Sequence, residues 1–291
     1  MVSAPRLYFD SVHIIESLRP DDLHTGRQLY EDLAPLTDAS TPPVTAHFHA
    51  VQSRAAFLEK LRSIAADARL HSHSPILHIE AHGHFTGIDV TSGEYLPWRE
   101  FEDELIAINE ISRLNLLVML AACQGAHLFK VMVAHVGDRA PMRMLIGPKG
   151  KIYPSEIEHA YPAFYRALFD TGDIGAAWRA MNDAVALGSQ TFQVFTAEHT
   201  FRTLMYGYFT TYCSEDALTR RENRAVALLK QEGRSEEDLE QDRQVIRGNL
   251  RDHRRHFQKF KKCFFFCDLY PENATRFGVT FEDCQRDPSE T

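Results

Sequence analysis

Short apolar runs that alternate with amphipathic segments constrain the fold of this chain more than any other feature. The clearest run, 114–122, contains a single polar residue, Asn115, and stops at Cys123. Runs of this kind are typical of strands in a parallel sheet that helices cover on both faces. Residues 97–111, which precede this run, carry apolar side chains at helical spacing. The alternation predicts parallel strands joined by right-handed crossovers.

The same reading extends over the first two thirds of the chain. We predict further strands at 12–16, 44–51, 75–81 and 142–147, a helix after the polar turn that starts at Arg19, and helices at 53–70 and from about Ala126. Together these elements predict a three-layer α/β domain with a mostly parallel central sheet over residues 1–200. Beyond residue 200 the sequence becomes charged and helix-prone. We interpret residues 201–291 as a helical extension packed on that domain.

Composition narrows the classes of partner. The chain has 291 residues, 44% of them hydrophobic, and a formal net charge of −8. A negative net charge argues against direct nucleic-acid binding, because phosphate groups attract basic surfaces. No apolar run approaches the roughly 18 residues that a membrane span needs, and the start of the sequence lacks the pattern of a secretory signal. We therefore expect a cytoplasmic protein that binds neither nucleic acid nor a membrane.

The cysteines give no sign of a disulfide framework. There are five, an odd number, in a fairly long chain without a recognisable signal, so we expect reduced thiols. Cys263 and Cys267 flank three phenylalanines, but three residues separate them and no second Cys/His pair lies nearby. This spacing disfavours a structural zinc site. The cysteines are Cys123, Cys213, Cys263, Cys267 and Cys284.

Two of the strongest predicted strands end at residues that suit thiol chemistry. His82-Gly83 follows the strand at 75–81, and Cys123 follows the run at 114–122. In open α/β sheets, functional residues gather just beyond the carboxyl ends of strands. The 41 residues from His82 to Cys123 fit a loop, a crossover helix and the next strand. We therefore expect the base and the nucleophile of a cysteine hydrolase to meet on neighbouring strands.

At these positions the sequence resembles a known family. Ala122-Cys123-Gln124-Gly125 is similar to the nucleophile turn of caspases, and Ala81-His82-Gly83 to their histidine turn. The wider pattern, over about residues 10–195, resembles the bacterial caspase-like peptidases called CHAT domains. The resemblance implies that His82 is the base, that Cys123 is the nucleophile, and that the backbone N–H groups of Gly83 and Cys123 form the oxyanion hole. Caspases carry glutamine where this chain has Ala121, so aspartate specificity is not implied.

Acidic side chains near the same strand ends are further candidates. Glu80 suits the role of orienting His82, as the third member of a triad does, or that of a structural ion pair. Glu16, Asp89 and Glu94 are candidates for the pocket that receives the residue before the cut, and solvated loop acids are the plainer interpretation. His78, Glu80 and His82 share one strand face, but a covering helix leaves little room there for a metal. No nucleotide-binding motif occurs, so we expect neither a metal nor a cofactor.

The leading hypothesis is a cysteine endopeptidase with a Cys123–His82 dyad that cleaves one or a few partner proteins. The CHAT resemblance implies an intracellular effector, often of bacterial defence, and we expect an activating protein or complex as a further partner. Two alternatives stay open: a catalytically inactive interaction module of the same fold, and a cysteine hydrolase of a small molecule, which calls for an enclosed apolar pocket.

Overall fold

The computed structural model describes residues 7–129, 137–185 and 191–288. The chain divides into two compact units. The first comprises residues 1–134 and 140–197, and the second comprises residues 135–139 and 198–291. The sequence suggested a change of character near residue 200. It gave no sign that the short segment 135–139 belongs to the second unit.

The first unit is built on a sheet in the strand order β2-β1-β3-β6-β7-β8. The first five strands run parallel, and β8 is antiparallel to β7. A short antiparallel pair, β4 and β5, extends the end of β3. The prediction of a mostly parallel sheet is confirmed. The strands are β1 (Ser11–Ser17), β2 (Thr45–Ala50), β3 (Pro75–Gly83), β4 (Gly87–Asp89), β5 (Tyr95–Pro97), β6 (Leu117–Ala121), β7 (Met144–Pro148) and β8 (Phe192–Thr196).

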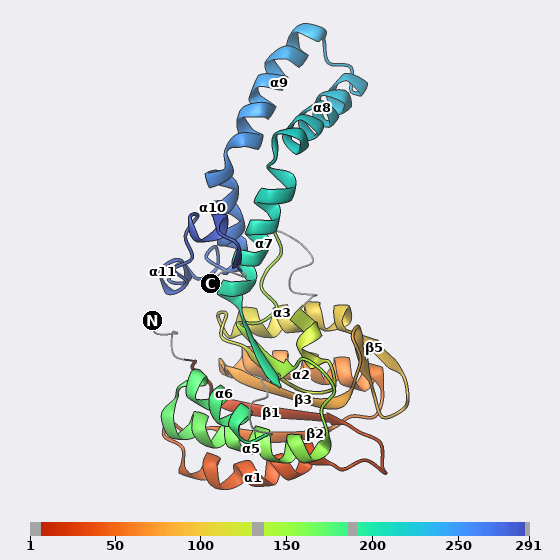
Figure 1. Ribbon diagram of the computed structural model, residues 1–291, viewed down its shortest axis with the longest axis vertical. Coiled ribbons are helices and arrows are strands. Elements are labelled where there is room, and N and C mark those ends of the chain that lie inside the picture. Colours follow the sequence, from red (N-terminus) through yellow and green to blue (C-terminus); the bar gives the residue numbers. More distant parts are fainter. Residues whose placement is uncertain (1–6, 130–136, 186–190, 289–291) are drawn as a thin grey trace. The chain divides into compact units, whose positions relative to one another are not determined.

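Helices cover both faces of this sheet (Figure 1). One face carries α2 (Arg54–His71), the 3-10 helix η1 (Trp98–Phe101) and α3 (Glu102–Ile111), and the other carries α1 (Thr25–Ala39), α5 (Pro154–Thr171) and α6 (Ile174–Asp183). The three-layer α/β architecture predicted from the sequence is confirmed. The helix expected from Ala126 begins as the 3-10 helix η2 (Gly125–Leu128), and its continuation from residue 130 lies outside the described residues.

Strand β3 shows why two layers form. Leu77 and Ile79 point into the core shared with α2 and α3, whereas Ile76 points into the core shared with α1, α5 and α6. Successive strand side chains alternate between faces, so a run that is apolar at nearly every position needs cover on both. Each fully buried aliphatic side chain of this kind stabilises the fold by about 1.5–3 kcal/mol.

The second unit consists of helices around its own aromatic core. Phe201 lies 5.2 Å from Phe264 and 5.0 Å from Phe265 between ring centroids, and Phe265 stacks on Phe277 at 5.0 Å. Docking of these phenylalanines on the α/β domain stays a prediction. The elements are α7 (Ala197–Tyr212), α8 (Glu215–Gln231), α9 (Glu236–Arg251), α10 (His253–Phe264), α11 (Asn273–Arg276) and η3 (Asp283–Gln285).

Two sequence-based expectations concern the chain as a whole. All five cysteines are free in the structure, and the expectation of reduced thiols stays a prediction. Among the described residues, no helix combines the length and the apolar character that crossing a bilayer requires.

Candidate active site

His82 and Cys123 lie at the carboxyl ends of adjacent parallel strands. In the β3–β6 register, Glu80 stands opposite Ala121, and His82 and Cys123 each follow two residues later. Because side chains alternate along a strand, both project toward the face covered by α1 and α5. Cys123 packs against the apolar core of that face. Adjacent strands are separated by about 5 Å, so the register places the two residues at neighbouring positions of adjacent strand ends.

The backbone at Gly83 presses against the backbone of Cys123. A Cβ atom added at Gly83 would lie 1.9 Å from the carbonyl oxygen of Cys123 and 2.9 Å from its amide nitrogen. No residue with a side chain fits at that separation. The glycine after His82 therefore lets the ends of β3 and β6 approach closely, and it brings the peptide groups proposed for the oxyanion hole into one place.

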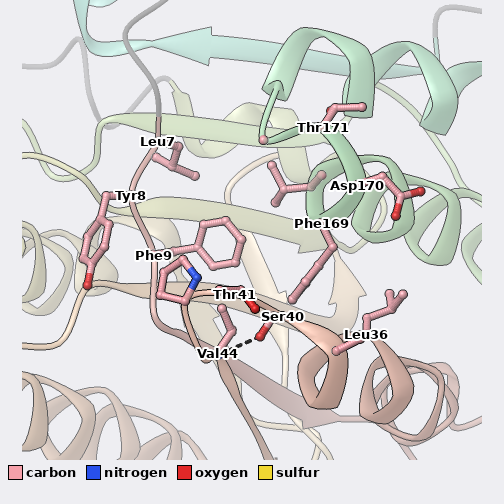
Figure 2. A pocket seen from close by; sticks show the side chains of 14 residues that line it. Leu7, Tyr8, Phe9, Leu36, Ser40, Thr41, Val44, Phe169, Asp170 and Thr171 are labelled. Carbon is pink, nitrogen blue, oxygen red and sulfur yellow. Dashed lines mark hydrogen bonds between the residues drawn. The ribbon is translucent and has the colours of Figure 1, made fainter.

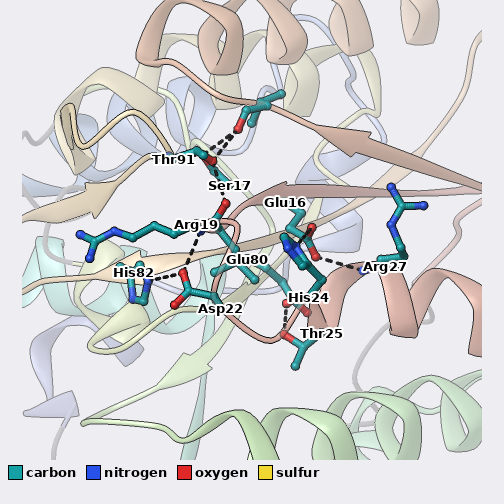
Figure 3. Close-up of polar contacts among 12 residues, drawn as sticks. Glu16, Ser17, Arg19, Asp22, His24, Thr25, Arg27, Glu80, His82 and Thr91 are labelled. Carbon is teal, nitrogen blue, oxygen red and sulfur yellow. Dashed lines mark hydrogen bonds and ion pairs between the residues drawn. The ribbon is translucent and has the colours of Figure 1, made fainter.

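The imidazole of His82 is held by Asp22, from the loop between β1 and α1 (Figure 3). Its Nε2 lies 2.8 Å from the Asp22 carboxylate, and its side chain is 44% exposed. The same carboxylate accepts the amide N–H of Arg19 at 2.8 Å. Burial tends to raise the pKa of Asp22, but the Arg19 amide and the His82 ring together hold it below its ordinary value. Asp22 is therefore ionised at neutral pH and fixes the ring through Nε2.

The sulfur of Cys123 is held by the loop that follows β7. The amide N–H of Ile152 lies 3.5 Å from Sγ, and the thiol lies 3.6 Å from the Ile152 carbonyl oxygen. One residue after the cysteine, Gln124 adopts a left-handed conformation with φ of 61°, and its N–H donates to the Gly150 carbonyl at 2.9 Å. The turn after β6 is thus fixed by a second loop.

A buried polar layer supports both strand ends. Glu80 accepts a hydrogen bond from Thr25, at the start of α1, and pairs with His78 at 3.0 Å. Tyr165 contacts the other nitrogen of His78 at 3.3 Å, and the Tyr161 hydroxyl donates to the Leu120 carbonyl at 2.6 Å. Burial, followed by the negative charge of Glu80, raises the pKa of both tyrosines, so both hydroxyls stay protonated. The sequence suggested that Glu80 orients His82. In the structure Asp22 makes the contact with His82 instead.

Glu16 binds the start of α1. It is buried, its Oε1 lies 2.8 Å from Nδ1 of His24, and its Oε2 accepts the amide N–H of Arg27 at 3.1 Å. A Cβ at Gly26 would lie 3.0 Å from Glu16 and 3.3 Å from Glu80, so both carboxylates converge on the first turn of this helix. A helix N-terminus favours nearby negative charge. The geometry gives Glu16 a structural contact, and its role in a substrate pocket stays a prediction.

The other candidate acids also have partners in the chain. Asp89, on β4, lies 2.8 Å from the imidazole of His84. Glu94 accepts the Ser92 hydroxyl at 2.7 Å and the amide N–H of Arg54, at the start of α2. These two hydrogen bonds lower the pKa of Glu94. Asp89 stands opposite His82 in the β3–β4 pairing and so lies close to the dyad, whereas Glu94 caps a helix.

Metal chemistry has no support from the described side chains. Within residues 7–129, 137–185 and 191–288, no group of three or more His, Cys, Asp or Glu side chains is arranged to hold a metal ion. His78 and Glu80 pair with each other, while His82 pairs with Asp22.

A cavity of about 520 Å³ lies beside the segment that precedes β1 and the end of α5 (Figure 2). Phe9 and Phe169, whose rings pack edge to face at 5.6 Å, form part of its wall. Ser40 and Asp170 add polar groups. The cavity lies at the amino ends of the strands, whereas His82 and Cys123 lie at the carboxyl ends, so it is separate from the dyad.

Asp22 and the Ile152 loop are the site features that the sequence did not indicate. A signal for Asp22 was present, because the acidic pair Asp21-Asp22 follows the predicted strand at 12–16 after four intervening residues. Only the strand order, with β1 next to β3, shows that this loop reaches His82. The contact of Ile152 with the sulfur depends on the path of a loop that no local pattern specifies.

Comparison with known proteins adds a likeness of fold. No family model matches the sequence, and no curated protein matches it. Among solved structures, the chain is similar to the crystal structure of the Drosophila initiator caspase Dronc, with a TM-score of 0.49 and 11% sequence identity. The match covers 67% of this chain and 83% of that chain. The residues of the site, rather than this likeness, carry the functional conclusion.

Proposed function

We propose that this chain is a cysteine endopeptidase in which Cys123 is the nucleophile and His82 the base. The observation that carries the proposal is the pairing of these residues at adjacent strand ends, on one face of the sheet, with the backbones of Gly83 and Cys123 in contact. A thiol nucleophile needs a base within reach and N–H groups where the oxyanion forms. Both requirements can be met here by groups from two neighbouring strands.

The hydrogen bond from Nε2 of His82 to Asp22 assigns the ring nitrogens. With Nε2–H donating to the carboxylate, Nδ1 is the nitrogen that takes the thiol proton. The Cys123 sulfur then bonds to the substrate carbonyl carbon, and the backbone N–H groups of Gly83 and Cys123 stabilise the oxyanion. The C–N bond breaks, and the proton on Nδ1 passes to the leaving amine. Water next attacks the acyl-enzyme, which releases the acid product and restores the thiol.

The biological setting belongs to the same proposal. The resemblance to CHAT peptidases favours a cytoplasmic effector, of the bacterial defence type, that cleaves one or a few partner proteins after activation by another protein. Sites open at the ends of strands suit extended peptides, whose main chain can hydrogen-bond to the enzyme.

Alkylation and proteolysis together test the assignment. Burial raises the pKa of Cys213, Cys263 and Cys267, and raises that of Cys284 to about 12. Iodoacetamide at pH 7 should therefore label Cys123 first, because the thiolate is the reacting form and a raised pKa leaves less of it at the other four cysteines. Cys123→Ala should abolish cleavage of a broad peptide library, read by mass spectrometry, and Cys213→Ala is the matched control.

The alternatives predict different results. An inactive interaction module would cleave no peptide while remaining folded. A small-molecule hydrolase would leave the library intact yet turn over simple thioesters or amides through Cys123. Undiminished peptide cleavage by purified Cys123→Ala would refute the proposed nucleophile.

A further inference from the structure

Exposed apolar side chains gather around the proposed dyad. Four of the seven large apolar side chains that stand exposed in the described part of the first unit are carried by segments at the carboxyl end of the sheet. Isolated exposed apolar residues are ordinary, but a group around a reactive centre points to a binding surface. The four are Leu23, Phe85, Tyr95 and Tyr153, and the other three are Tyr8, Tyr30 and Leu70.

Phe85 stands on the β3 side of the nucleophile. It lies two residues after Gly83, whose backbone touches Cys123, and its side chain is 59% exposed. Its ring packs edge to face on His127, at 4.9 Å between centroids, in the short helix that follows Cys123. The contact with His127 thus fixes the Phe85 ring, while much of the ring surface faces solvent.

Tyr153 stands on the β7 side. It follows Ile152, whose backbone contacts the Cys123 sulfur, and its side chain is 56% exposed. The ammonium group of Lys151 lies 4.9 Å from the centre of the ring. The amide N–H of Tyr153 donates to Glu156 at 2.9 Å, which fixes the residue at the start of α5.

These two aromatic residues follow strands that flank the strand of the cysteine: Phe85 follows β3 and Tyr153 follows β7, and β6 lies between them. Two strand spacings, or about 10 Å, separate the ends of β3 and β7. Extended chain advances about 3.3 Å per residue, so roughly three residues span that gap. A peptide that crosses the strand ends with its scissile bond over Cys123 would therefore bring one side chain to Phe85 and another to Tyr153.

Charge at this end of the sheet does not favour a basic residue at the cut. The candidate pocket acids already have partners: Glu16 pairs with His24 and an amide, Asp89 pairs with His84, and Glu94 binds a hydroxyl and an amide. A carboxylate engaged in this way offers less to an incoming lysine or arginine than an unpaired one. The apolar surface of Phe85 and Tyr153 is the more available feature.

We propose that the substrates are extended peptide segments with bulky apolar side chains on both sides of the scissile bond, one resting on Phe85 and the other on Tyr153. The inference rests on the proposed function, since it assumes that Cys123 attacks the peptide. It makes Phe85 and Tyr153 specificity-determining residues, with proton transfer left to His82.

The test is a proteome-derived peptide library cleaved by the full chain, followed by kinetics on individual peptides. We expect leucine, phenylalanine and other bulky apolar residues to be enriched on both sides of the cut. Phe85→Ala and Tyr153→Ala should each lower kcat/KM about tenfold on such peptides, mainly through KM, because each removes apolar contact area. Tyr8→Ala, which changes a ring that is 58% exposed at the opposite end of the strands, should leave kcat/KM unchanged.

A second measurement does not need turnover. Fluorescently labelled apolar peptides should bind Cys123→Ala several-fold more tightly than peptides with alanine at the two flanking positions, and Phe85→Ala should remove the difference. Cleavage without apolar enrichment, enrichment of charged residues, or equal binding of both peptides would overturn this inference and leave the proposed function standing. Failure of the wild-type chain to cleave any peptide would overturn both.

Discussion

His82 and the histidines of β1 and β2 belong to one sheet but occupy very different surroundings. His82 stands half exposed at the end of β3, with its Nε2 held by a carboxylate. His13, in the middle of β1, is 7% exposed, and its ring stacks on the rings of His47 and His49, at 4.7 and 5.5 Å between ring centroids. Burial, followed by the neighbouring His47, His49, His73 and Lys60, lowers the pKa of His13 to about 3.

The difference shows that residue type alone does not make a histidine functional. A ring that is buried beside other histidines and a lysine stays neutral and packs as part of the sheet face. A ring that faces solvent and is oriented by an ionised carboxylate is able to exchange a proton with a neighbour. On this basis the structure separates His82 from the histidines of β1 and β2.

The largest expected effect is on turnover. His82→Ala should lower kcat by about 10²–10⁴-fold, because it removes proton transfer while leaving the peptide-binding surface in place. His47→Ala, in the edge strand, is the control and should leave kcat unchanged. Steady-state kinetics on a library-derived peptide measures both variants. Equal losses would show that the two histidine environments are not functionally distinct.

A substitution at Gly83 should disturb the close approach of the β3 and β6 backbones that positions Cys123. Gly83→Ala places a Cβ atom against the Cys123 carbonyl and forces β3 and β6 apart. We expect alkylation of Cys123 to slow at least about tenfold as the site distorts, and stability to fall by about 1–3 kcal/mol, typical of overpacking. The control is Gly278→Ala, where no atom lies within 4 Å of the added Cβ. Urea unfolding and timed labelling report the two effects separately, and wild-type values for both would contradict the close approach.

The sequence predicted the layers of the first unit well, and the site less completely. The apolar run ending at Cys123 and the run ending near His82 are local patterns, and a parallel sheet places their ends together. Strands β4 and β5 went unpredicted because three residues are too few for a clear period, and β8, which is not a continuous apolar run, was also not predicted. The partner of His82 was missed for another reason. Strand β3 offered Glu80 two residues away, whereas Asp22 reaches the ring only through the pairing of β1 with β3.

Asp22 provides a finer test of what distinguishes His82. Asp22→Asn keeps a side chain of nearly the same shape but removes the negative charge that fixes the ring through Nε2. Because the ring that accepts the proton stays in place, the loss should be smaller than in His82→Ala, and it should appear in kcat with little change in KM. Asp22→Glu should recover part of the loss. The matched control is Asp21→Asn, the exposed neighbouring acid, which should behave as wild type. A loss in KM alone would assign Asp22 to substrate binding instead.

The smallest effect concerns the stacked histidines and the pH dependence of stability. Burial and nearby cations lower the pKa of His13 to about 3 and that of His49 to about 4, from 6.5 in an unfolded chain. Both rings are therefore neutral in the folded protein and take up protons on unfolding below pH 6.5. Their contribution to stability is complete above that pH, and it is lost progressively as the pH falls toward the folded values. Between pH 6.5 and 5, the loss from His13 amounts to about 1–2 kcal/mol.

His13→Gln should reduce this pH dependence by a similar amount, measured as the difference in urea unfolding free energy between the two pH values. His71→Gln, which changes an exposed histidine on α2, should leave it unchanged, since a solvated ring has no comparable burial. Identical pH dependence in His13→Gln and wild type would mean that His13 takes up its proton equally well in the folded chain, and the contrast with His82 would then rest on the carboxylate alone.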